Sequence, residues 1–188
     1  KPMLAWSIDQ AKKSKHKMKI IVSTDSQEYA DIAEKYGAEV PFLRPKEISQ
    51  DLSTDFEFLK HCVDFLEKNE NYKSDFIVQL RPTYPSRKVE ILDDTIDIFI
   101  KERNNYDSLR TIIPFEKSPF KMYTLEENNL EPLFRKLGDL DEPYNQCRQN
   151  LPNTYLHNGY IDILNSSLVK TGLISGEKIY GYKMSKNE

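Results

Sequence analysis

Short apolar runs separated by amphipathic segments constrain the fold of this chain more than any other feature of its sequence. Apolar residues recur at helical spacing at Leu92, Ile96 and Phe99, and in three earlier segments. Four other runs have the length and the composition of strands: Met18–Val22, Ala38–Leu43, Phe76–Leu80 and Tyr106–Ile113. Strands that alternate with amphipathic helices predict the α/β class, with three α/β/α layers and a mostly parallel sheet.

Capping residues mark two of the expected helix ends. Gly37 directly follows an apolar stripe that ends at Tyr36, and glycine commonly terminates a helix at this position. Thr54 and Glu57 have the spacing of a capping box, which predicts that another helix begins at Thr54.

The alternation of strands and helices stops after Pro114. Residues 119–134 are typical of two short strands that form a hairpin. Residues 136–153 are polar, irregular and too long for a simple connection, so we expect them to be functional or interfacial. Strand character returns at Tyr155–Leu164. We therefore expect one domain over residues 1–188, with an inserted antiparallel arm over residues 114–153.

Composition excludes several kinds of partner. The 188 residues include 27 basic and 30 acidic side chains and six glycines, with a net charge of −3. This near balance leaves no polycationic face for nucleic acid. No run of about 18 apolar residues is present, so we expect no membrane span. The scattered glycines form neither a Gly-x-Gly-x-x-Gly fingerprint nor a Walker-type loop. Two widely separated cysteines and no signal peptide predict a cytoplasmic location.

Polar side chains directly after buried strands predict where a ligand binds, since ligands of open α/β sheets lie beyond the carboxyl ends of the strands. The most informative segment is the loop at Gln79–Arg87, with prolines that stiffen it and two arginines that suit an anion. A proline-rich turn with solvated arginines explains the same spacing equally well. Arg44 follows a strand in the same way, whereas ordinary capping is the better explanation for Thr54.

A third polar cluster lies between Arg148 and Ile163. Asn158 and Gly159 form a dipeptide that usually marks a tight turn. Here it interrupts an apolar run with strand character, which favours a bulge where the backbone approaches a ligand.

These clusters carry a family resemblance. The segment Gln79–Arg87 resembles the Gln-x-x-Pro-Thr-x-Pro-x-Arg motif of the acylneuraminate cytidylyltransferases, the CMP-sialic acid synthetases. Five further segments resemble the family in the same order and at similar spacing: Val22–Asp25, Arg44–Pro45, Ser118–Lys121, Arg148–Pro152 and Asn158–Ile161. The resemblance runs over essentially the whole chain.

The resemblance implies a nucleotide-diphosphosugar-transferase-like fold that forms a homodimer through the inserted arm. It implies transfer of CMP from CTP to the anomeric hydroxyl of a nine-carbon 2-keto sugar acid, with release of pyrophosphate and with Mg²⁺ as cofactor. Sialic, legionaminic and pseudaminic acids all remain open as the substrate. Two alternatives also stay open: another sugar nucleotidyltransferase of the same fold, and a non-catalytic nucleotide-binding relative.

The resemblance also implies roles for individual residues. It places the cytosine and ribose of CTP against four residues: Arg44, Ser53, Thr54 and Asp55. It gives the catalytic roles to Gln79, Arg148 and Lys121. Arg148 is expected to bind the carboxylate of the sugar acid, and the sugar site is expected to comprise Gln79, Lys121, Arg148 and Asn158.

The sequence departs from the family pattern in three places. The family's phosphate-binding Ala-Arg-x-Gly-Ser-Lys loop is expected before Lys1. Its Asp-x-Asp metal motif is expected after the last strand, so no metal ligand is assigned here and the 188 residues alone are expected to be inactive. Asp55 stands where many relatives have a small or apolar residue.

Overall fold

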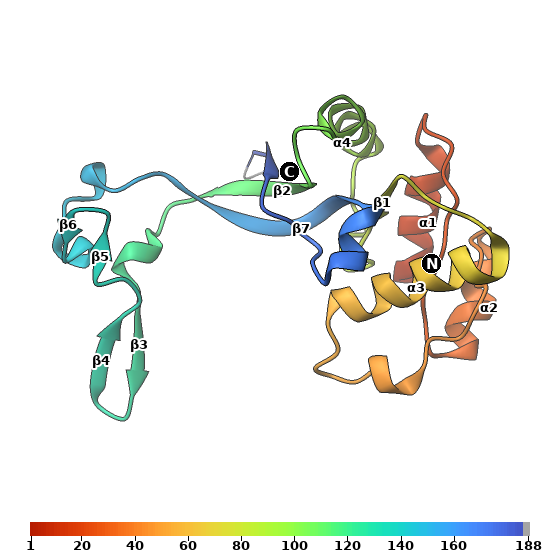
Figure 1. Cartoon of the computed structure of the whole chain (residues 1–188), viewed down its shortest axis with the longest axis horizontal. Helices are drawn as coiled ribbons and strands as arrows, with labels where there is room; N and C mark the ends of the chain where they lie inside the picture. The colour runs from red at the N-terminus through yellow and green to blue at the C-terminus, as the bar shows by residue number, and fades with distance from the viewer. Residues whose placement is uncertain (186–188) are drawn as a thin grey trace. The chain divides into compact units, whose positions relative to one another are not determined.

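The helices form where the sequence places apolar stripes and caps. The computed structural model describes residues 1–185, which divide into two units: Lys1–Thr111 with Gly159–Tyr182, and Ile112–Asn158 with Lys183 onward. The first unit contains the α-helices of the described chain: α1 (Met3–Lys13), α2 (Gln27–Lys35), α3 (Asp55–Glu70) and α4 (Val89–Glu102) (Figure 1). These helices confirm the four predicted segments.

Both predicted helix boundaries are confirmed. Gly37 follows α2 with φ of +88°, a conformation that costs glycine no steric strain. Thr54 is the N-cap of α3, and its backbone N–H donates to the Glu57 carboxylate at 2.5 Å. This capping box satisfies donors that the first turn of a helix otherwise leaves unpaired.

The α/β class is confirmed, and the sheet is mixed. Four strands, β1 (Phe76–Gln79), β2 (Ser108–Phe115), β7 (Thr154–Asn165) and β8 (Ile179–Lys183), lie in the order β1-β7-β2-β8. β1 and β7 are antiparallel, with Gln79 opposite Asp162. Parallel pairing occurs where the first two strands were expected, as isolated bridges of Ile21 with Glu39 and of Thr24 with Leu43.

The core of the first unit forms between the apolar stripes and the sheet. Leu92, Ile96 and Phe99 of α4 are at most 1% exposed, as are Ile161 and Ile163 of β7. A second cluster packs Leu59 and Val63 of α3 against Leu164, Leu168 and Val169. Complete burial of such side chains is the main favourable term in folding, at about 25 cal/mol per Å² of apolar surface.

Arg87 is a buried cation within this unit, with 3% of its surface exposed. Its guanidinium donates to the carbonyl oxygens of Tyr160 (2.8 Å) and Arg81 (2.9 Å) and to Oε1 of Gln10 (2.9 Å). Gln10 in turn donates to the carbonyl oxygen of Pro85 at 2.8 Å. Burial lowers the pKa of Arg87 to about 10, so holding its charge in the interior is costly at neutral pH. These hydrogen bonds offset that cost and tie the loop after β1 to α1 and β7.

The second unit holds the predicted hairpin. β3 (Tyr123–Glu126) pairs antiparallel with β4 (Asn129–Pro132), and Glu126 lies opposite Asn129, which confirms the two short strands expected in residues 119–134. The polar stretch that follows contains β5 (Lys136–Leu137), β6 (Leu140–Asp141) and two single 3-10 turns, Pro143–Asn145 and Arg148–Asn150. The single-domain boundary over residues 1–188 stays a prediction, and its last three residues lie outside the described ones.

None of the helices in residues 1–185 combines the length and the apolar character needed to cross a bilayer.

Replacing Arg87 with methionine should lower the free energy of unfolding by about 3 kcal/mol, because the buried carbonyl oxygens of Tyr160 and Arg81 would lose their donor. Urea denaturation followed by circular dichroism measures the change. Arg135→Met is the control: the Arg135 side chain is 69% exposed, and we expect a change within about 0.5 kcal/mol. Equal losses in the two variants would contradict the structural role of Arg87.

Candidate functional site

In the first unit, four polar side chains meet beside the end of β1. Nε2 of Gln79 donates to Oδ2 of Asp55 at 3.0 Å. Nη2 of Arg81 donates to the same Asp55 oxygen at 2.6 Å, and Nη1 of Arg81 donates to Oδ2 of Asp162. We call Asp55, Gln79, Arg81 and Asp162 the acid–arginine cluster. The capping of α3 places Asp55 here, and the antiparallel register of β1 and β7 places Asp162 opposite Gln79.

The cluster holds one cation between two anions. Burial by itself disfavours the charge on Arg81, but the hydrogen bonds and the charges of Asp162 and Asp55 outweigh it, so the pKa of Arg81 is raised. Asp162 is 6% exposed, and a carboxylate so deeply buried requires a charged partner. Arg81 therefore stays charged and paired with both aspartates.

The arginines of the loop after β1 make internal contacts. Arg81 pairs with the two aspartates, and Arg87 donates to oxygens inside the unit. The sequence did not predict these contacts.

A glycine of β7 lies close to this cluster. Gly159 has φ of +67°, as the Asn-Gly pair within a strand suggested. A Cβ atom at this position would lie 3.5 Å from Nη1 of Arg81. The backbone therefore approaches the Arg81 side chain at the point where the sequence predicted a close approach to a ligand.

Arg44, Ser53 and Thr54, expected at the nucleotide, make local contacts. Nε of Arg44 donates to Oγ of Ser49 at 2.9 Å, and its guanidinium lies 5.7 Å from the centre of the Phe58 ring. Oγ of Ser53 accepts from the backbone N–H of Gln50 at 2.9 Å. Thr54 caps α3, which is the ordinary role that the sequence favoured for it.

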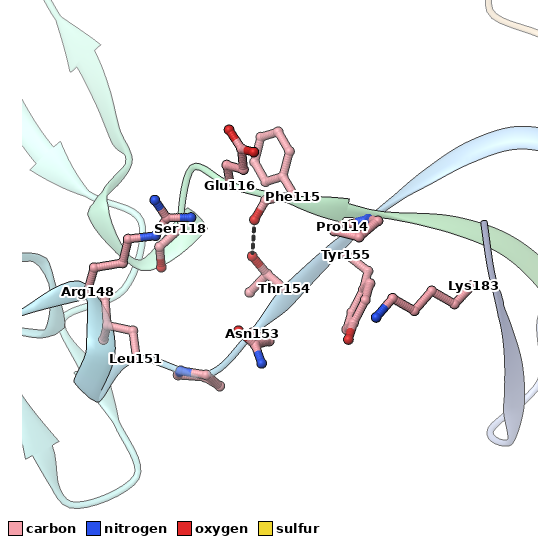
Figure 2. Close-up of a pocket in the computed structure, with 11 residues that line it drawn as sticks. Pro114, Phe115, Glu116, Ser118, Arg148, Leu151, Asn153, Thr154, Tyr155 and Lys183 are labelled. Atoms are coloured by element: carbon pink, nitrogen blue, oxygen red, sulfur yellow. Dashed lines mark hydrogen bonds between the residues drawn. The ribbon is translucent and has the colours of Figure 1, made fainter. Parts of the chain in front are cut away.

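A pocket of about 230 Å³ lies in the second unit. Figure 2 shows Arg148 and Lys183 at opposite ends of the lining residues, with Thr154 between them. Ammonium Nζ of Lys183 lies 5.6 Å from the centre of the Tyr155 ring. The remaining lining residues are Pro114, Phe115, Glu116, Ser118, Leu151, Pro152 and Asn153. At about 30 Å³ per water molecule, the volume is that of roughly eight waters, so the pocket suits one small molecule.

Arg148 is the group in this pocket best suited to a ligand. Its side chain is exposed, and within residues 1–185 the structure shows no hydrogen bond from its guanidinium. Oγ of the neighbouring Ser118 is buried, and no hydrogen-bond partner for it lies among the described residues. A planar guanidinium with free donors suits a carboxylate, which it can bind through two parallel hydrogen bonds.

A second cavity of about 340 Å³ shares Arg148 and Ser118 with the first. Lys121 lines it, and Nζ of Lys121 donates to the carbonyl oxygen of Tyr144 at 3.2 Å. Lys117 also lines it, so cationic side chains outnumber Glu116 in its wall. The structure thus brings together Arg148 and Lys121 of the predicted sugar site.

Asn158, also predicted for the sugar site, lies outside the linings of both cavities. Its Nδ2 donates to the sulfur of Met184 at 3.3 Å, a weak hydrogen bond.

Within residues 1–185, no group of three or more His, Cys, Asp and Glu side chains could hold a metal ion. Asp55 and Asp162 already share the guanidinium of Arg81.

Two features of these sites escaped the sequence analysis. One is the pairing of Arg81 with Asp162: Arg81 directly follows an apolar run and Asp162 interrupts another, a signal that could have suggested a buried pair. The other feature is the presence of Lys183 and Tyr155 in one pocket. Neither residue belongs to a sequence motif, and only the pairing of β7 and β8 with β2 brings them together.

Comparisons with known proteins agree on one family. The model of the family described as cytidylyltransferase matches residues 1–146. An N-acylneuraminate cytidylyltransferase of Escherichia coli is 31% identical over 165 residues, which are 88% of this chain and 36% of that protein. A CMP-N,N'-diacetyllegionaminic acid synthase of Legionella pneumophila is 41% identical over 101 residues, which are 52% of this chain and 42% of that protein. This chain therefore spans less than half the length of either relative.

A solved structure extends the agreement to the fold. CMP:2-keto-3-deoxy-manno-octonic acid synthetase complexed with CTP superposes with a TM-score of 0.66, at 11% identity, over 98% of this chain and 80% of that one. At this identity the match concerns the fold alone.

Replacing Arg81 with methionine should destabilise the protein by about 3 kcal/mol, because the buried carboxylate of Asp162 would lose its countercharge. The double variant Arg81→Met with Asp162→Asn should recover part of this loss, since it also removes the buried charge. Urea denaturation of the two variants and of the Asp162→Asn single variant measures the coupling. A double variant as unstable as Arg81→Met would show that an unpaired charge is not the cause.

Proposed function

The chain belongs to the cytidylyltransferase family, and we propose that the protein is a CMP-nonulosonate synthetase. In this proposal it transfers CMP from CTP to a nine-carbon 2-keto sugar acid of the sialic, legionaminic or pseudaminic type. The relatives named for such acids support the substrate class.

The exposed guanidinium of Arg148 at the pocket is the observation that carries the proposal. A 2-keto sugar acid differs from a sugar 1-phosphate by its planar carboxylate, which calls for a partner with matching planar donors. Arg148 has its guanidinium at the end of a pocket sized for one small molecule, with the buried hydroxyl of Ser118 beside it. We propose that Arg148 binds the carboxylate and that Lys121 and Asn158 contact other parts of the sugar.

The proposed reaction is a displacement at phosphorus. The anomeric hydroxyl oxygen forms a bond to the α-phosphorus of CTP, the bond between this phosphorus and the bridging oxygen to the β-phosphate breaks, and pyrophosphate leaves with that electron pair. The hydroxyl proton passes to solvent or buffer base. Such a step depends mainly on alignment of the two reactants and on cationic groups that offset developing charge.

Residues of the first unit have proposed roles of their own. We propose that Gln79 contacts the sugar, and that Arg44 with Ser53, Thr54 and Asp55 faces the cytosine and ribose. Mg²⁺ belongs to the proposal as the cofactor that offsets phosphate charge, with no described residue assigned to it.

A homodimer in the cytoplasm is part of the same proposal. Leu125 and Leu130 lie opposite each other on the hairpin of β3 and β4, and they are 68% and 57% exposed. Exposed apolar side chains mark a protein interface where they form a contiguous patch, and this pair is where the proposal places the contact. Cys62 and Cys147 are both free, which fits a reducing compartment.

Arg148→Ala in the full-length protein should raise the KM for the sugar acid about 10- to 100-fold, the worth of hydrogen bonds to a charged group. The KM for CTP should change less than about twofold, because the nucleotide does not use this guanidinium. Pyrophosphate release, measured with sialic, legionaminic and pseudaminic acids in turn, provides both constants.

Arg135→Ala is the matched control, because it removes an exposed arginine of the same unit. A rise confined to the KM for CTP would contradict the assigned role of Arg148. Pyrophosphate release with a sugar 1-phosphate, and with none of the three acids, would favour another nucleotidyltransferase of this fold.

A further inference from the structure

The acid–arginine cluster determines which way round the Gln79 side-chain amide lies. Nitrogen and oxygen of such an amide have nearly the same shape, so their assignment must follow from hydrogen-bond partners. The partner of Gln79 is Oδ2 of Asp55 at 3.0 Å. An ionised carboxylate only accepts hydrogen bonds, so the amide must turn its NH₂ group to Asp55. Its carbonyl oxygen Oε1 must then point elsewhere.

Two features of the fold favour the acceptor role of Asp55. Arg81 donates to the same Oδ2 atom at 2.6 Å, and a guanidinium is a donor at every physiological pH. Asp55 is also the first residue of α3, where the helix dipole favours a negative charge. The polarity of the Gln79 contact is therefore set by its surroundings.

Arg81 is itself anchored from two sides. Its second nitrogen donates to the buried carboxylate of Asp162, and its backbone carbonyl accepts from the buried Arg87 at 2.9 Å. The resulting series of contacts runs from Asp162 through Arg81 and Asp55 to Gln79. Each member fixes the orientation of the next.

The carbonyl oxygen of Gln79 is available to a ligand. Within residues 1–185 the structure shows no donor to Oε1, and Gln79 is only half-buried. We propose that Asp55 and Arg81 are positioning residues that hold Gln79 as a hydrogen-bond acceptor for a hydroxyl group of the sugar acid. This inference rests on the proposed function and refines it: Asp55 acts through Gln79, which explains why an acid stands at this position.

The chemistry of an amide limits what Gln79 then does. An amide oxygen accepts a hydrogen bond but does not take up a proton at neutral pH, so Gln79 does not act as a general base. It orients a hydroxyl group, and the benefit of orientation appears in kcat when that hydroxyl is the attacking one.

Asp55→Leu tests the orientation. Leucine offers no acceptor to Gln79, so the Gln79 amide can turn over and present NH₂ to the substrate. We expect kcat to fall about tenfold, the typical worth of one oriented hydrogen bond. Asp64→Leu is the matched control, because Asp64 is an exposed aspartate of the same helix that pairs with Lys60.

The conservative variant provides the stronger test. In Asp55→Asn the side-chain oxygen can still accept from both Arg81 and Gln79, as Oδ2 of Asp55 does. We expect Asp55→Asn to keep kcat within about threefold of the wild type. An Asp55→Asn variant as slow as Asp55→Leu would overturn the acceptor role of Gln79.

An NMR measurement separates this inference from the proposed function. The side-chain ¹⁵N resonance of Gln79, assigned by its loss in Gln79→Glu, should move in Asp55→Leu because its acceptor is gone. It should stay in place in Asp64→Leu. A Gln79 resonance that ignores Asp55 overturns the inference, whether or not the enzyme is active. Absence of pyrophosphate release from the wild-type protein contradicts the proposed function alone.

Discussion

The organisation of the first unit depends on one buried guanidinium. Arg87 lies in the interior and donates to backbone carbonyls of β7 and of the loop that follows β1, and to Gln10 of α1. Placing a charge there disfavours folding by itself, as the lowered pKa of Arg87 shows. The arrangement persists because the loop carbonyls also need donors that apolar neighbours cannot supply. The Arg87 side chain thus supplies hydrogen-bond donors to the loop and fixes the path of its backbone.

The loop path then controls the chemistry beside β1. The carbonyl that Arg87 holds belongs to Arg81, whose side chain bridges Asp55 and Asp162. Asp55 in turn orients Gln79. The motif that resembles the cytidylyltransferase signature therefore combines two kinds of residue: Gln79, which donates to Asp55, and two arginines that hold the surrounding backbone and carboxylates in place. In the second unit, Arg148 keeps its donors available to a ligand because it lies on an exposed 3-10 turn.

Local sequence rules predicted the helices and the hairpin well. Apolar stripes, the Thr54–Glu57 capping box and the turn at residues 126–129 act over a few residues, and distant contacts do not override them. The strands at Met18–Val22 and Ala38–Leu43 were predicted longer than they are, since strand length depends on pairing that the sequence does not reveal. The antiparallel pairing of β1 with β7 was not predicted for the same reason.

By itself, the sequence determined the fold class, the helix boundaries and the order of motifs that places the chain among the cytidylyltransferases. The catalytic roles that it suggested for Arg148 and Gln79 stay predictions. Only the tertiary structure decided what the arginines after β1 contact and which way the Gln79 amide faces. Asp162 lies far along the chain from Gln79 and Arg81, and strand register brings the three together. Hydrogen-bond polarity depends on such partners, so no local pattern could have predicted it.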